Sequence, residues 1–275
     1  MAEQVTYAYA VLRDATGLAS ALTEVEGVAR APVRLVTAGT GAEELAAAVS
    51  PVPAPDFQES ALRRHLEDLE WLEAVARAHH TVIEVLAAHT TVLPLRLATV
   101  YLDDERVRAM LRQDAVVFSQ ALDRLSGHLE WGVKIYVEAP SDTAVPDAAG
   151  VPDGAEGLSP GRAYLRTRRA QRHSMDERYE AARQAAERVE AIGRAVAAGH
   201  ARHRVQQGEL AASAGENVVN DAYLVARGTA EDFRKQILDA AEGLSGIRIE
   251  VTGPWAPYSF AAPEREENPA PDRAP

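Results

Sequence analysis

Histidine is the first side chain to consider for chemistry, because this 275-residue chain has no cysteine to act as nucleophile, metal thiolate or disulfide partner. Four of the eight histidines lie between residues 65 and 89, in or directly after a predicted helix. His79 and His80 diverge by about 100° around that helix, and His65 lies about 21 Å along its axis from His79. One ion cannot reach these side chains together, so the spacing excludes a metal site here.

Two further histidines, His200 and His203, share one face of a second predicted helix. No Asp, Glu or Cys occupies a neighbouring ligand position on that face. Packing along a helix seam is therefore favoured over metal binding.

Motifs for catalysis or cofactor binding are also missing from the sequence. It contains no nucleophile elbow, no phosphate-binding glycine loop and no suggestively spaced pair of acids. A GxG occurs in VTAGTGAEEL at 36–45, but it lacks the third glycine of the dinucleotide fingerprint and lies too near the N-terminus to complete a βαβ unit. We expect a turn there, no enzymatic activity and no cofactor.

Charge is distributed unevenly along the chain. The net charge of −12 argues against general nucleic-acid binding, which needs an excess of Lys and Arg. Residues 162–207 nevertheless carry eleven Arg against five acids. The run RAYLRTRRAQR at 162–172 binds an anionic partner in one interpretation. In the other it is a solvated helix end, or one that pairs with the acidic helix at 59–73.

The elements of the first half follow from local patterns. Alternation predicts strands at 6–12 and 33–39, and PVPAPD at 51–56 reads as a connector. Apolar residues at helical spacing predict one long helix over 59–88, and a second helix starts at Asp103 or Asp104 and continues to 127. The segments 91–101 and 130–137 read as strands, and Pro94 places the first of them at a sheet edge or bulge.

The second half begins after a Pro- and Gly-rich linker at 139–161. A four-three apolar spacing predicts a long, coiled-coil-like helix over 163–206. Next come a strand at 216–227, a helix from 229 to 244 with Thr229 as its N-cap, and a strand at 246–252. The polar, proline-rich tail at 263–275 is predicted to be disordered.

Segments 59–138 and 163–252 share one order of elements: long helix, strand, shorter helix, strand. We therefore predict an α+β fold of two domains, 1–138 and 162–262, each a small antiparallel sheet with helices in a ferredoxin-like arrangement. No stretch reaches the roughly 18 apolar residues of a membrane span. A soluble cytoplasmic protein, without membrane contact, is expected.

Pro, Gly and aromatic residues recur at the predicted strand ends. The motifs are LPLR at 93–96, EWGVK at 130–134, SPGRAYL at 159–165, NDAYLV at 220–225 and GPWAPYSF at 253–260. Together with the first strand, TYAYAVL, their order and content resemble the gas vesicle protein F/L family over residues 5–262. The sequence departs from that pattern at Leu97 and Ala98, where Phe and Gly are expected, and at Ala256, where Pro is expected.

The resemblance implies a non-enzymatic accessory or minor structural protein of the gas vesicle, a hollow protein shell. Its implied partners are the hydrophobic shell-forming protein and other accessory proteins, which it contacts during nucleation or assembly. The residues at these motifs and in the Arg run are the candidates for partner contact: Leu93, Pro94, Arg96, Trp131, Lys134, Arg162, Arg166, Arg169, Tyr223, Trp255 and Tyr258.

The segment VTGPWAPYSF at 251–260 holds three aromatic residues in a chain that is only 5% aromatic. Two prolines restrict its backbone. Our first interpretation is therefore that the Trp255 ring is a packing lid over the C-terminal sheet, and our second is that it belongs to a partner-binding patch. The alternative function is a ferredoxin-like sensor or enzyme with a small-molecule pocket beneath this turn.

Overall fold

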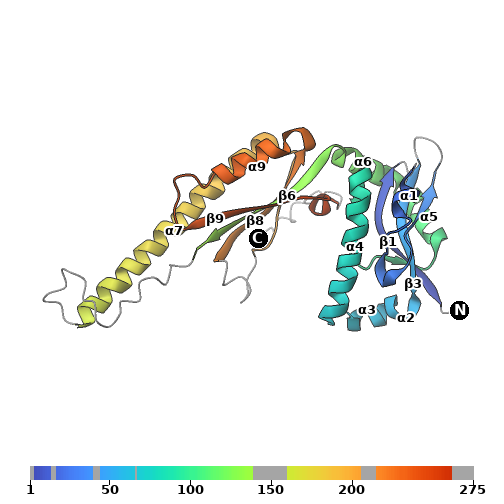
Figure 1. The fold of residues 1–275 in the computed structure, drawn as a ribbon, viewed down its shortest axis with the longest axis horizontal. Coiled ribbons are helices and arrows are strands. Elements are labelled where there is room, and N and C mark those ends of the chain that lie inside the picture. The colour runs from blue at the N-terminus through green and yellow to red at the C-terminus, as the bar shows by residue number, and fades with distance from the viewer. Residues whose placement is uncertain are drawn as a thin grey trace, which may run out of the picture. The chain divides into compact units, whose positions relative to one another are not determined.

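The computed structural model describes residues 3–13, 17–39, 44–65, 67–138, 160–205 and 215–261. Contacts divide the chain into an N-terminal unit, residues 1–130 with 254–275, and a C-terminal unit, residues 131–253 (Figure 1). This division differs from the predicted boundaries, because the strand after residue 130 pairs inside the C-terminal unit and the turn after residue 253 packs in the N-terminal one. Most of the predicted linker and the tail lie outside the described residues.

The sheet of the N-terminal unit has the strand order β2-β3-β1-β4. Its strands are β1 (Gln4–Arg13), β2 (Arg34–Ala38), β3 (Leu45–Pro53) and β4 (Val92–Pro94), with β5 (Val100–Tyr101) also pairing β1; all of these pairings are antiparallel. Pro94 lies opposite Ala10 on the edge strand β4, which confirms its predicted edge position.

Strand β3 was not predicted, and the predicted connector at 51–56 is wrong. The run of alanines in β3 is buried on both faces and gives no alternation for a pattern to detect. Its two prolines lie beyond Val49, where the pairing with β2 ends. They face the free edge there, so a missing N–H donor costs the ladder nothing.

Helices cover both faces of this sheet, as the burial of every residue in Thr6–Leu12 requires. In Figure 1, α4 lies on one side of β1 and β3 and α5 on the other. The helices of this unit are α1 (Leu18–Leu22), η1 (Val28–Arg30), α2 (Ala54–Phe57), α3 (Glu59–His65), α4 (Leu69–His89), α5 (Asp104–Gln113) and α6 (Ala115–Leu125), with η4 (Tyr258–Phe260) in the C-terminal turn.

Both long helices predicted for the first half are divided in two. Asp68 separates α3 from α4, because its carboxylate accepts the N–H groups of Glu70 and Trp71 and starts a new helix. Asp114 separates α5 from α6 with a non-helical backbone. Asp103 caps α5 through the N–H of Arg106, as predicted.

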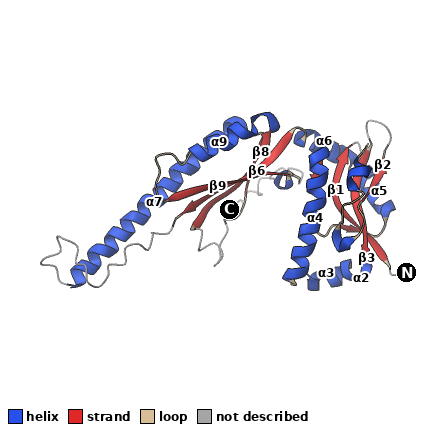
Figure 2. Cartoon of the chain, viewed as in Figure 1, coloured by secondary structure: helices blue, strands red, loops and turns tan. Residues whose placement is uncertain are grey.

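The C-terminal unit is built on a second antiparallel sheet with the strand order β7-β8-β6-β9. Its elements are β6 (His128–Val137), α7 (Pro160–Val196), β7 (Gly199–Arg202), β8 (Glu216–Ala226), η3 (Arg227–Thr229), α9 (Ala230–Asp239) and β9 (Ile247–Trp255). Figure 2 shows α7 and α9 side by side along one face of this sheet.

The long helix ends at Val196, ten residues before its predicted end. Residues 199–202 instead form β7, paired with β8. His200 and His203 are therefore not on a helical face: the His200 ring stacks on Tyr223 at 4.8 Å, and its Nε2 lies 3.0 Å from an Asp221 carboxylate oxygen. The helix packs against α9 and β8, and the predicted supercoil stays a prediction.

Both units connect their elements in the same way. Each runs strand, helix, strand, strand, helix, strand, and each sheet places these strands in the order second, third, first, fourth. A repeat was predicted, but from residues 59 and 163. The repeated elements begin earlier, at β1 and β6, and the ferredoxin-like description stays a prediction.

Candidate functional site

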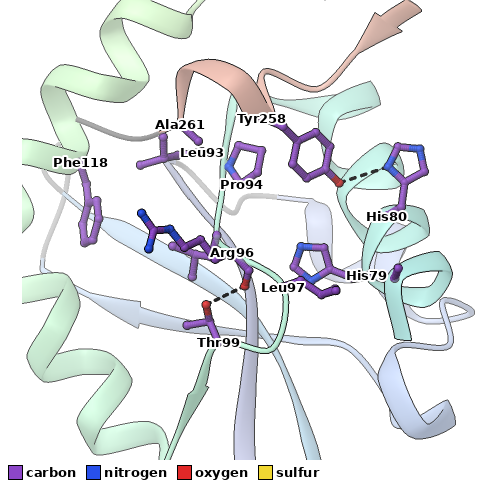
Figure 3. Close-up of a pocket in the computed structure, with 12 residues that line it drawn as sticks. His79, His80, Leu93, Pro94, Arg96, Leu97, Thr99, Phe118, Tyr258 and Ala261 are labelled. Atoms are coloured by element: carbon purple, nitrogen blue, oxygen red, sulfur yellow. Dashed lines mark hydrogen bonds between the residues drawn. The ribbon is translucent and has the colours of Figure 1, made fainter. Parts of the chain in front are cut away.

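A cavity of about 620 Å³ lies in the N-terminal unit, and we call it the LPLR groove after the motif in its wall (Figure 3). Four segments line it. They contribute Ala76, His79 and His80 from α4; Leu93, Pro94, Leu95, Arg96, Leu97 and Thr99 from β4 and the turn that follows; Phe118 from α6; and Tyr258 and Ala261 from the C-terminal turn.

The LPLR wall is held against β1 by backbone hydrogen bonds. The N–H of Leu95 donates to the carbonyl of Tyr9 at 2.8 Å, and the carbonyl of Thr99 accepts from Ala8 at 2.9 Å. Between these two points the chain turns through Ala98, whose φ of 61° lies in the left-handed region. The expected family residue at this position is Gly, which reaches that region without a steric penalty.

His79 is a buried structural residue at the base of the groove. Its Nδ1 lies 2.9 Å from the hydroxyl of Tyr7, which also accepts the N–H of Ala98 at 3.0 Å. Burial lowers the pKa of His79 from 6.5 to about 4, and the nearby backbone of Leu95 offsets this only in part. The imidazole is therefore neutral at physiological pH and links α4 to the LPLR turn.

The opposite wall is the C-terminal turn, which packs on α4 through His80. The His80 Nδ1 lies 3.2 Å from the hydroxyl of Tyr258, and its Nε2 lies 3.2 Å from a carboxylate oxygen of Glu84. Burial raises the pKa of Tyr258, so this phenol stays protonated. The Trp255 ring lies 5.8 Å from the His80 ring.

Trp255 does not form the predicted lid over the C-terminal sheet. Its side chain lies against α4 and is 39% exposed, whereas the buried positions of the turn are Ala256 and Pro257. The interior positions of this turn therefore belong to residues smaller than tryptophan.

Glu130 fixes the C-terminal turn to the end of the N-terminal unit. Its carboxylate is buried and accepts both the N–H of Ser259 at 2.8 Å and the Ser259 hydroxyl at 2.7 Å. Arg124 donates to the carbonyl of Phe260 at 2.8 Å. Two motifs that are distant in sequence, EWGVK and PYSF, are thereby joined by direct hydrogen bonds.

Four of the predicted candidates, Leu93, Pro94, Arg96 and Tyr258, meet at the LPLR groove, and Trp255 lies beside it. The others lie in the C-terminal unit. Trp131 and Tyr223 are buried there, Lys134 is half-buried on β6, Arg166 and Arg169 are exposed on α7, and the side chain of Arg162 lies outside the described set.

Sequence reasoning missed His79, His80, Phe118 and Glu130. Glu130 could have been noticed, because it is an acidic residue at the start of an otherwise apolar predicted strand. The histidines were tested only as metal ligands, and their contacts with tyrosines could not be foreseen without the fold.

The groove is mainly apolar, and its polar groups are largely engaged with one another. No ion pair involves Arg96 in the described part of the chain. Within those same ranges no three His, Asp or Glu side chains are grouped to hold a metal ion. No described helix is long and apolar enough to cross a membrane. The groove therefore offers mainly apolar surface.

The fold and this site define a two-unit α+β protein with a mainly apolar groove in its N-terminal unit. A family model described as "Gas vesicle synthesis protein GvpL/GvpF" matches residues 5–262. Gas vesicle protein L of Streptomyces sp. (strain CB03234) is 41% identical over 267 residues, covering 96% of each chain. The chain therefore belongs to the GvpL/GvpF family of gas vesicle proteins.

A more distant relative matches by sequence, and two solved structures share the fold. Gas vesicle protein F2 of Halobacterium salinarum is 22% identical over 94% of this chain and 93% of its own length. The crystal structure of GvpF from Anabaena sp. PCC7120 superposes with a TM-score of 0.60 at 18% identity, covering 95% of this chain and 98% of that one. GvpF from Microcystis aeruginosa gives 0.58 at 17% identity, covering 94% and 99%.

Proposed function

We propose that this protein is an accessory or minor structural component that acts in the cytoplasm during gas vesicle assembly. Its LPLR groove docks an apolar segment of the shell-forming protein, and other accessory proteins bind elsewhere on its surface. One observation carries this proposal. The LPLR and PYSF motifs, more than 150 positions apart, form facing walls of one apolar cavity.

The size and lining of the groove support docking of side chains. A volume of about 620 Å³ is large enough for several apolar side chains from one helix or strand. Leu97, Tyr258 and Trp255 are 38%, 36% and 39% exposed, so apolar surface continues from the cavity onto its rim. Exposed apolar surface around a groove is typical of a protein interface.

A small-molecule sensor or enzyme is the second candidate, because a pocket does lie beneath the aromatic turn. The side chains that would serve as acid or base are already engaged. His79 is neutral and bonded to Tyr7, and His80 is held between Glu84 and Tyr258. Docking of an apolar segment accounts for the lining better than a reaction does.

Substitution of Leu97 by Asp tests the groove in a vesicle-forming cell. Leu97→Asp places a charge on the exposed rim, so it should deplete intact vesicles and reduce capture of the shell protein. The free energy of unfolding should change by no more than about 0.5 kcal/mol. Vesicles are counted by electron microscopy, and capture is measured by affinity pull-down.

Leu102→Asp is the matched control, because Leu102 is 71% exposed and lies outside the groove. It should leave both vesicle number and capture unchanged. Normal vesicles and normal capture with Leu97→Asp would refute the groove as the docking site.

A further inference from the structure

Arg96 brings a positive charge to an otherwise apolar groove. Several arginines of the N-terminal unit have acidic partners: Arg34 pairs with Asp104 at 2.6 Å, and Arg13 pairs with Asp123. Arg96 pairs with no carboxylate in the described ranges, although the chain carries a net charge of −12. A lone cation in such a place is available to a bound partner.

The backbone that carries Arg96 is fixed. The carbonyl of Arg96 accepts the Thr99 hydroxyl at 2.7 Å and the Thr99 N–H at 3.2 Å. In Figure 3 the guanidinium lies toward Phe118, across the groove from His80 and Tyr258. The backbone position from which the Arg96 side chain extends is therefore set before any partner arrives.

The two histidines that line the groove already have partners within the protein, although the buried Nε2 of His79 has none among the described residues. Tyr258 and Glu84 contact His80, and Tyr7 contacts His79. Among the charged groups that line the groove, Arg96 is the one left to recognise a charge on a ligand.

We propose that the LPLR groove binds an apolar segment of the shell-forming protein that carries a carboxylate, and that this carboxylate pairs with the guanidinium of Arg96. This inference rests on the proposed docking function and adds the chemistry of the bound segment. A guanidinium fits a carboxylate with two parallel hydrogen bonds, and such a charged pair is stronger than a hydrogen bond between neutral groups.

Peptides that tile the shell-forming protein, each with a fluorescent label, provide the test. Their affinity for the full-length chain is measured by fluorescence anisotropy. Arg96→Gln should raise the Kd of the binding peptide about tenfold, as loss of one charged hydrogen-bonded pair does, and Arg96→Lys should raise it less. Added salt should weaken binding to the wild type and have little effect on binding to Arg96→Gln.

Arg106→Gln is the matched control, since Arg106 is also exposed but lies on α5, outside the groove. It should bind the peptide with wild-type affinity. A charge swap completes the design. Arg96→Glu should lose the peptide, and a peptide with its acid replaced by Lys should restore binding to that variant.

The outcomes separate the two proposals. If Leu97→Asp abolishes peptide binding while Arg96→Gln binds like the wild type, the groove is a docking site but the carboxylate inference is wrong. If no shell-protein peptide binds and Leu97→Asp cells form normal vesicles, the docking function itself fails.

Removal of residues 262–275 should leave the Kd unchanged. A tenfold gain in affinity would instead assign the groove to that segment of the chain and overturn the inference.

Discussion

At the scale of single residues, Ala98 occupies a backbone position that suits glycine. Its φ of 61° costs a residue with a Cβ about 1–2 kcal/mol, while glycine loses about 0.5–1 kcal/mol more entropy on folding. We predict that Ala98→Gly raises the free energy of unfolding by about 0.5–1 kcal/mol, measured by urea denaturation. Ala109→Gly on the exposed face of α5 should lower it by about 1 kcal/mol. A lower denaturation midpoint for Ala98→Gly would contradict the assigned strain.

His79 should make stability depend on pH. Its pKa is about 4 in the folded chain and 6.5 when unperturbed, so between these values the unfolded state binds more protons. Its contribution is complete above pH 6.5 and is lost as the pH falls toward 4, by up to roughly 3 kcal/mol.

Replacement of His79 tests this dependence. The unfolding free energy of His79→Asn should fall less steeply over that pH range than that of the wild type. Exposed His89, at the end of the same helix, provides the control. His89→Asn should keep the wild-type slope, and an equally steep slope in His79→Asn would show that another group titrates.

At the scale of elements, the packing of α7 on β8 depends on a missing side chain. A Cβ at Gly193 would overlap the Tyr223 ring: it would clash with Cε1 and would lie 2.9 Å from Cδ1. Alanine normally stabilises a helix relative to glycine by about 1 kcal/mol. We predict that Gly193→Ala is instead destabilising by about 1–3 kcal/mol, as overpacking is.

Thermal denaturation measures this effect. Gly228→Ala, where a Cβ meets nothing within 4 Å, should be close to neutral. The double variant Gly193→Ala/Tyr223→Leu should recover part of the loss caused by the clash. An unchanged or higher Tm for Gly193→Ala alone would show that α7 and β8 can move apart without loss of stability.

How far the elements could be predicted depended on the strength of their local signals. Strands with alternating or β-branched residues and the Asp103 helix cap were predicted, because local chemistry decides them. Strand β7 was missed because His200 and His203 happen to continue the spacing of α7. The sequence marks the end of a helix less clearly than its periodicity. Here the end of α7 depends on the pairing of β7 with β8, which is a contact between distant residues.

At the scale of the whole chain, the same connection order occurs in both units. The sequence did not reveal this order, because β3 and β7, which complete it, were not predicted. The composition of the LPLR and PYSF motifs indicated that both are candidates for partner contact. It could not show that they face each other, since that requires residues 254–261 to return to the N-terminal unit. Local patterns carry little information on contacts between segments so distant in sequence.

The return of residues 254–261 has a consequence for synthesis. A ribosome makes most of the N-terminal unit first, but Tyr258, Ala261 and the Ser259 that Glu130 holds are added only after the whole C-terminal unit. A nascent or prematurely ended polypeptide therefore lacks one wall of the groove. The groove is complete only once residue 261 has been added, so a polypeptide that stops before residue 254 presents only part of this surface.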